Sequence, residues 1–120
     1  MELTAQQQEE FYALVERRTA EIDYAALANG VRPLVTRKRR QEAADYLLRA
    51  FNLEVEQRNT ERLPIEADRL EALCKERVPD LLRQDKCGFI EVLLVMIIVN
   101  VISRVIVTWL WDLFNKQPRK

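Results

Sequence analysis

The chain has 120 residues, of which 48 % are apolar and 32 % are charged, so we expect one small domain with at most one further segment. Its 19 basic and 19 acidic residues cancel, which leaves no overall field to attract nucleic acid. There is no histidine, and the only cysteines are Cys74 and Cys87. Histidine catalysis and histidine-containing zinc sites are therefore excluded, and we expect two reduced thiols with no cofactor or metal.

Residues 1–86 are expected to form a soluble helical head. Thr4 and Gln7 have the spacing of a capping box, and Asn29-Gly30 supplies a left-handed stop, so the first helix should end near residue 28. A break near Thr19 is an open alternative. The apolar positions of this helix recur at helical spacing and are Phe11, Leu14, Val15, Ile22 and Ala26.

Two further helices are expected in the head. Thr36 can cap the second, whose apolar stripe consists of Ala44, Leu47, Leu48, Phe51 and Val55. Residues 59–64 should form a break, because the residue before a proline avoids helical angles. The third helix should follow from Ile65, with Leu70, Leu73, Cys74 and Val78 facing inward. Pro79 is expected to end this helix and to begin a fourth short segment over residues 80–86.

An almost unbroken apolar tract, Phe89–Trp111, follows the head. Its 23 residues far exceed a strand, whereas a membrane-spanning helix needs about 20. Its fifteen Leu, Ile, Val and Phe residues favour insertion by roughly 4 to 9 kcal/mol, more than the cost of about 3 kcal/mol for one arginine. We therefore expect a transmembrane helix and its flanks over residues 87–114, with a short basic tail over residues 115–120. Trp109 and Trp111 are placed to anchor it at the membrane interface.

The same tract also fits a buried core helix of a soluble bundle. Its charge-free window is only Val92–Ser103, and Arg104 interrupts the second half. A helix lying in the membrane plane is a third alternative. The N-terminus lacks the pattern of a signal peptide, so we expect a single-pass protein with a cytoplasmic head.

Four polar residues within the tract fall on one face, whereas Glu91 lies nearly opposite. At 3.6 residues per turn they lie within about 140° of one another. They are Asn100, Ser103, Arg104 and Thr108. We interpret this face as a contact with a neighbouring transmembrane helix. The alternatives are a tolerated arginine that reaches the membrane surface, with the small polar residues bonded to their own backbone, and the lining of an aqueous pore.

A basic cluster, Arg37-Lys38-Arg39-Arg40, opens the second helix, where the helix dipole disfavours cations. It could contact anionic lipid headgroups or an acidic partner. Residues 1–30 carry six acids against two bases and could supply that acidic face within the chain, which would make the cluster an ordinary solvated charge run. A nucleic-acid backbone is the weakest candidate, because the tyrosines do not gather into a stacking platform beside these cations.

The sequence thus predicts an all-α protein, with a small bundle of three to four short helices followed by a C-terminal transmembrane helix. Because no nucleophile or general base stands out, we do not expect an enzyme. The predicted function is that of a structural or accessory subunit of a membrane complex. Its expected partners are other membrane subunits or copies of itself, together with the lipid bilayer. The alternatives are an oligomeric pore-forming protein and a soluble helical-bundle interaction protein with a buried C-terminal helix.

Overall fold

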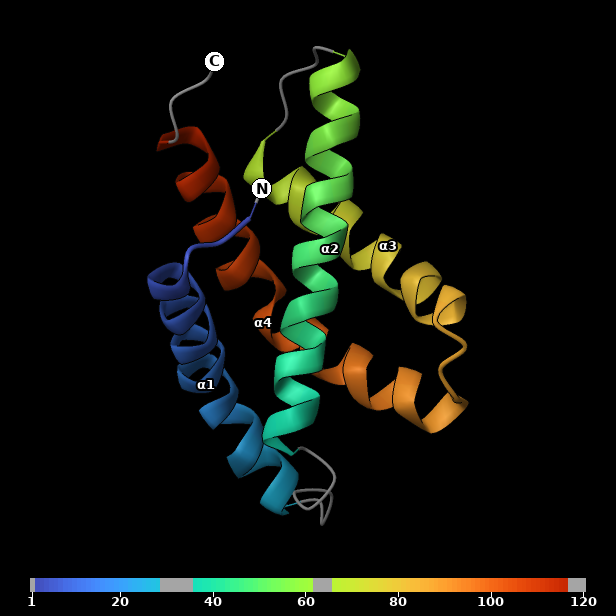
Figure 1. The fold of residues 1–120 in the computed structure, drawn as a ribbon. Coiled ribbons are helices and arrows are strands. Elements are labelled where there is room, and N and C mark those ends of the chain that lie inside the picture. Colours follow the sequence, from blue (N-terminus) through green and yellow to red (C-terminus); the bar gives the residue numbers. More distant parts are fainter. Residues whose placement is uncertain (1, 29–35, 62–65, 117–120) are drawn as a thin grey trace.

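The computed structural model describes residues 2–28, 36–61 and 66–116, and the side chains of 21–28 and 58–61 are outside this description. Over the described residues the chain forms four α-helices and no strand (Figure 1). They are α1 (Ala5–Ala28), α2 (Arg37–Glu61), α3 (Ala67–Gln84) and α4 (Phe89–Lys116). The predicted all-α fold with a long apolar C-terminal helix is confirmed.

The predicted starts of the first two helices are also confirmed. The backbone N–H of Gln7 donates to Thr4 Oγ1 at 3.2 Å, and that of Thr4 donates to Gln7 Oε1 at 2.9 Å, which completes the capping box of α1. Thr36 Oγ1 accepts the backbone N–H of Arg39 at 3.2 Å at the start of α2. α1 is not interrupted at Thr19, since it runs unbroken from Ala5 to Ala28. The buried threonine hydroxyl donates to the carbonyl of Val15, one turn back, at 2.8 Å. The expected stop at Asn29-Gly30 lies outside the described residues.

The expected boundaries around α3 need correction. The predicted break over residues 59–64 begins too early, since α2 continues to Glu61, and α3 begins at Ala67. α3 then runs through Pro79 to Gln84, so there is no separate segment after the proline. A proline inside a helix costs about 3 kcal/mol, but Leu81 and Leu82 in the following turn are buried, and their burial offsets that cost.

A tight turn joins α3 to α4. The N–H of Lys86 donates to the carbonyl of Arg83 at 3.0 Å, and that of Cys87 donates to the carbonyl of Leu82 at 3.1 Å. These two bonds form a Schellman motif, which requires a left-handed residue at its centre. Lys86 occupies that position with φ 58°, although glycine is the usual choice. The turn reverses the chain, so that the first part of α4 passes beneath α3 in Figure 1.

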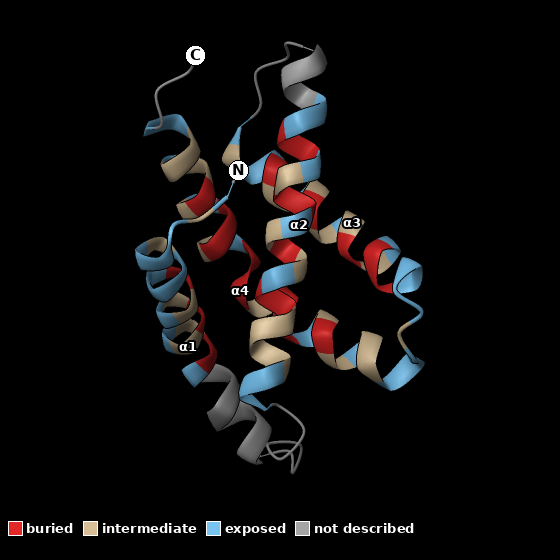
Figure 2. Cartoon of the chain, viewed as in Figure 1, coloured by how far each residue is buried: buried red, intermediate tan, exposed pale blue. Residues whose placement is uncertain are grey.

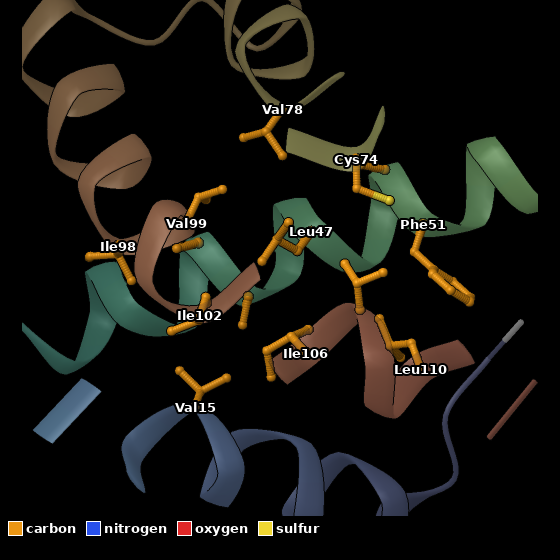
Figure 3. Close-up of a cluster of buried hydrophobic side chains, with 14 of the residues drawn as sticks. Val15, Leu47, Phe51, Cys74, Val78, Ile98, Val99, Ile102, Ile106 and Leu110 are labelled. Atoms are coloured by element: carbon orange, nitrogen blue, oxygen red, sulfur yellow. The ribbon is translucent and has the colours of Figure 1, made fainter. Parts of the chain in front are cut away.

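The core of the molecule is built around α4, which contacts all three other helices. Side chains from α1, α2 and α3 converge on it in Figure 3, among them Val15, Leu47 and Val78. Its course bends within the bundle, as Figure 1 shows. The apolar residues that α4 buries are Val95, Ile98, Val99, Ile102, Ile106, Val107 and Leu110. Length and composition let α4 span a membrane, and the same properties suit a core helix.

The inward-facing positions of the other helices largely follow the predicted periodicity. Red buried positions recur along the inner sides of α1, α2 and α3 in Figure 2. The buried members of the predicted stripes are Phe11, Val15, Ala44, Leu47, Phe51, Val55, Leu70, Cys74 and Val78. Leu14, Leu48 and Leu73 are only partly covered, because they lie at the margins of their stripes. The side chains of Ile22 and Ala26 are outside the described set.

Candidate interaction surfaces

The polar residues of α4 divide into two groups. Asn100, Arg104 and Thr108 are exposed on the side of α4 that faces away from the bundle. Ser103 is buried instead, and its hydroxyl donates to Glu71 Oε1 of α3 at 3.2 Å. The structure thus brings three of the four predicted face residues together at the surface and gives the fourth a partner inside the bundle. We call Asn100, Arg104 and Thr108 the polar face.

An apolar edge continues the polar face toward the start of α4. It consists of Phe89, Ile90, Leu93 and Ile97, whose exposed fractions are 82 %, 67 %, 49 % and 44 %. These residues share the exposed side with the polar face, because both sets recur at helical spacing. Sequence reasoning missed this edge, since nearly every position in the first half of the tract is apolar and nothing marks which ones face outward.

The two tryptophans contact aromatic rings of the bundle. Trp109 lies 5.9 Å from the ring centroid of Phe11 in α1. Trp111 stacks on Phe114 at 5.9 Å, and Phe114 meets Phe51 of α2 edge to face at 6.4 Å. Aromatic pairs of this kind contribute about 0.5–1.5 kcal/mol beyond their buried area. In this arrangement Trp109 and Trp111, which the sequence predicts as anchors at the membrane interface, help to hold α4 against α1 and α2.

The basic cluster divides into a paired half and an exposed half. Arg39 Nη1 donates to Glu42 at 2.8 Å and to Glu91 of α4 at 2.6 Å, and hydrogen bonding to these carboxylates, to Glu91 above all, raises its pKa. Arg40 forms an ion pair with Glu16 of α1 at 3.2 Å, so the acidic first helix does supply a partner within the chain. Arg37 and Lys38 are exposed. The Arg39–Glu91 pair places the start of α2 beside the first turn of α4.

A second polar contact fixes the turn before α4 to α2. Arg49 Nη1 donates to Asp85 Oδ2 at 2.8 Å, and the hydroxyl of Tyr46 donates to the same oxygen at 2.6 Å. These bonds, that from Arg49 first, lower the pKa of the Asp85 carboxyl, whereas burial and then the bond to Asp85 raise the pKa of Tyr46. The guanidinium of Arg49 also lies 5.1 Å from the centroid of the Tyr46 ring. The beginning of α4 is therefore held at two points.

A buried ion pair joins α2 to α3. Buried Glu54 accepts from Arg77 Nε at 2.7 Å, beside a shallow, open hollow that is lined by Glu54, Leu73, Glu76, Arg77 and Asp80. Among the described residues no group of three or more metal-binding side chains comes together. Breaking a buried ion pair of this kind is costly, so the pair is best understood as a link between the two helices.

Comparisons of the chain with protein-family models, with curated proteins and with solved structures gave no match.

Proposed function

We propose that this protein is a membrane-associated helical subunit that acts through protein–protein contact. In this proposal α4 is the membrane element. The polar face of Asn100, Arg104 and Thr108 meets a neighbouring subunit or a second copy of the chain. The role is structural or accessory, and the bundle of α1 to α3 presents contact surfaces at the membrane.

The incomplete covering of α4 is the observation that carries this proposal. Its 28 residues extend roughly 42 Å, enough to cross a hydrocarbon core of about 30 Å. Only 39 % of the residues in its most apolar window are buried, and the others are partly or fully exposed. An apolar helix whose sole role is to fill a soluble core is expected to be covered over most of its surface. The apolar edge instead leaves large side chains in contact with solvent.

If α4 spans the membrane, the other three helices lose their contacts with it. Large side chains that now pack around α4 would lose that cover, among them Phe11, Leu47, Phe51, Leu70 and Val78. Burial of one such side chain stabilises a protein by about 1.5–3 kcal/mol, so five of them together approach the whole stability of a small domain. The three remaining helices would therefore need a partner or a second copy to cover them, which favours the role of a subunit.

A water-soluble interaction bundle is the second candidate, and the contacts of α4 with all three other helices favour it. Alkaline carbonate extraction of cell membranes that contain the full chain separates the two candidates. A membrane-spanning chain stays in the pellet after ultracentrifugation. A soluble bundle is recovered in the supernatant.

The polar face has its own test. Replacing Arg104 with leucine should weaken self-association or capture of a partner subunit in membranes, as measured by crosslinking. The matched control is Arg17→Leu, which removes another exposed arginine from α1. A passive anchor would insert at least as well with leucine at position 104 and would lose no contact.

A further inference from the structure

One end of the bundle combines exposed apolar and exposed cationic side chains. α2 begins near the bottom of the view in Figure 1 and α4 begins at its lower right, and both starts include exposed segments in Figure 2. Phe89 and Ile90 occupy the first turn of α4 and are the most exposed large apolar residues described. Leu93 extends the apolar surface by one further turn.

Cations border this apolar surface. Arg37 and Lys38 are exposed at the start of α2, and the 2.6 Å pair between Arg39 and Glu91 ties that start to the first turn of α4. Lys86 is exposed on the turn that leads into α4. An apolar wedge bordered by lysine and arginine is the composition with which proteins bind the surface of an anionic bilayer.

Among the side chains that the structure describes, the carboxylates near this end are paired within the chain. Glu42 and Glu91 both accept from Arg39, and Asp85 accepts from Arg49 and Tyr46. Arg39 and Arg49 thus offset two of these three negative charges, and with the exposed Arg37, Lys38 and Lys86 the described side chains of this end carry a net positive charge. Anionic headgroups would meet little repulsion here.

We propose that the compact bundle docks on anionic lipid surfaces through this end, which we call the docking end and define by Arg37, Lys38, Lys86, Phe89, Ile90 and Leu93. The side chains of Phe89, Ile90 and Leu93 enter the boundary between headgroups and acyl chains, while the three cations contact the headgroups. This inference rests on the proposed membrane association and adds to it the surface and the lipid charge that initiate contact.

Flotation of the purified full chain with vesicles tests the docking end. One set of vesicles contains phosphatidylcholine alone, and the other contains phosphatidylcholine with phosphatidylserine. We expect binding to the second set that weakens as salt is raised. The double variant Phe89→Ser with Ile90→Ser should reduce binding by at least about tenfold, because each substitution removes a large apolar side chain from the boundary between headgroups and acyl chains. The matched control is Leu53→Ser, at an apolar residue of α2 that is 39 % exposed.

The contribution of the cations to vesicle binding is measured with a separate variant. Replacing Arg37 and Lys38 together with glutamine should lower binding to phosphatidylserine vesicles by about tenfold or more. Binding to phosphatidylcholine alone should not change. Circular dichroism of each variant tests whether the helices stay intact. They should, because Arg37 and Lys38 form no ion pair with another of the described residues.

The outcomes separate this inference from the proposed function. Wild-type binding that neither double variant reduces would overturn the docking end and leave membrane association standing. No binding of the wild type to either vesicle set, together with full recovery in the carbonate supernatant, would overturn both. If sedimentation shows that Phe89→Ser with Ile90→Ser dissolves an oligomer while vesicle binding is kept, the apolar residues cover a second copy, and the docking proposal is wrong.

Discussion

Replacing Ile102 with alanine should destabilise the bundle strongly. Ile102 is completely buried among the core side chains in Figure 3, and its truncation leaves a cavity where the other helices pack against α4. Truncations of this kind cost about 2–5 kcal/mol. For a domain of this size, that is a large share of the total stability, which is typically about 5–15 kcal/mol.

The matched control is Ile97→Ala, which makes the same chemical change on the same helix. Because Ile97 is 44 % exposed, less apolar surface is lost and no enclosed cavity forms, so we expect a cost well under about 2 kcal/mol. Urea denaturation in detergent-free buffer, followed by tryptophan fluorescence, measures both. The only two tryptophans of the chain lie in α4, and Trp109 contacts Phe11, so the signal reports the docking of α4 directly.

Equal midpoints for these two variants would refute the packing of α4 inside the bundle. If α4 spans the bilayer, we expect the opposite result when the two variants are compared in lipid vesicles. Lipid surrounds Ile97 and Ile102 alike in that case, and the two variants should behave similarly.

Three further predictions follow from local contacts. Lys86→Gly should raise the free energy of unfolding by about 1 kcal/mol in urea denaturation, because glycine adopts a φ of 58° without strain; an unchanged or lower midpoint would contradict this. A thiol reagent should modify half-exposed Cys87 long before Cys74, whose pKa burial raises to about 12; equal rates would show that α3 is not packed as described. The lowered pKa of Asp85 stabilises the fold above pH about 4, and this stabilisation is lost as the pH falls further, so the advantage of the wild type over Asp85→Asn should disappear in acid; an advantage independent of pH would rule out the contact with Arg49.

Local signals in the sequence predicted the local structure well. The caps at Thr4 and Thr36 depend on side chains that bond backbone groups three residues away, so they are encoded within a single turn. The passage of α3 through Pro79 could not be predicted in this way. It depends on the burial of Leu81 and Leu82 against other helices, which is a tertiary contact that outweighs a local preference.

The candidate surfaces were only partly predictable, because they depend on which side of α4 faces inward. Arg104 is costly to bury, so its outward position agrees with its chemistry. Ser103 is adjacent in sequence yet faces inward, because it lies one turn from the buried Val99 and Val107, and Glu71 of α3 accepts its hydroxyl there. The apolar edge gave no sequence signal, because Phe89 and Leu93 look the same as buried neighbours such as Val95.

Quenching of the intrinsic fluorescence by brominated phospholipids tests most directly whether α4 enters the bilayer. Trp109 and Trp111 both lie in the last third of α4, so no labelling is needed. We predict that vesicles with brominated acyl chains quench their emission strongly, and that the quenching changes with the depth of the bromine atoms. Emission that stays unquenched while the protein is bound to the vesicles and remains helical would contradict a membrane-embedded α4.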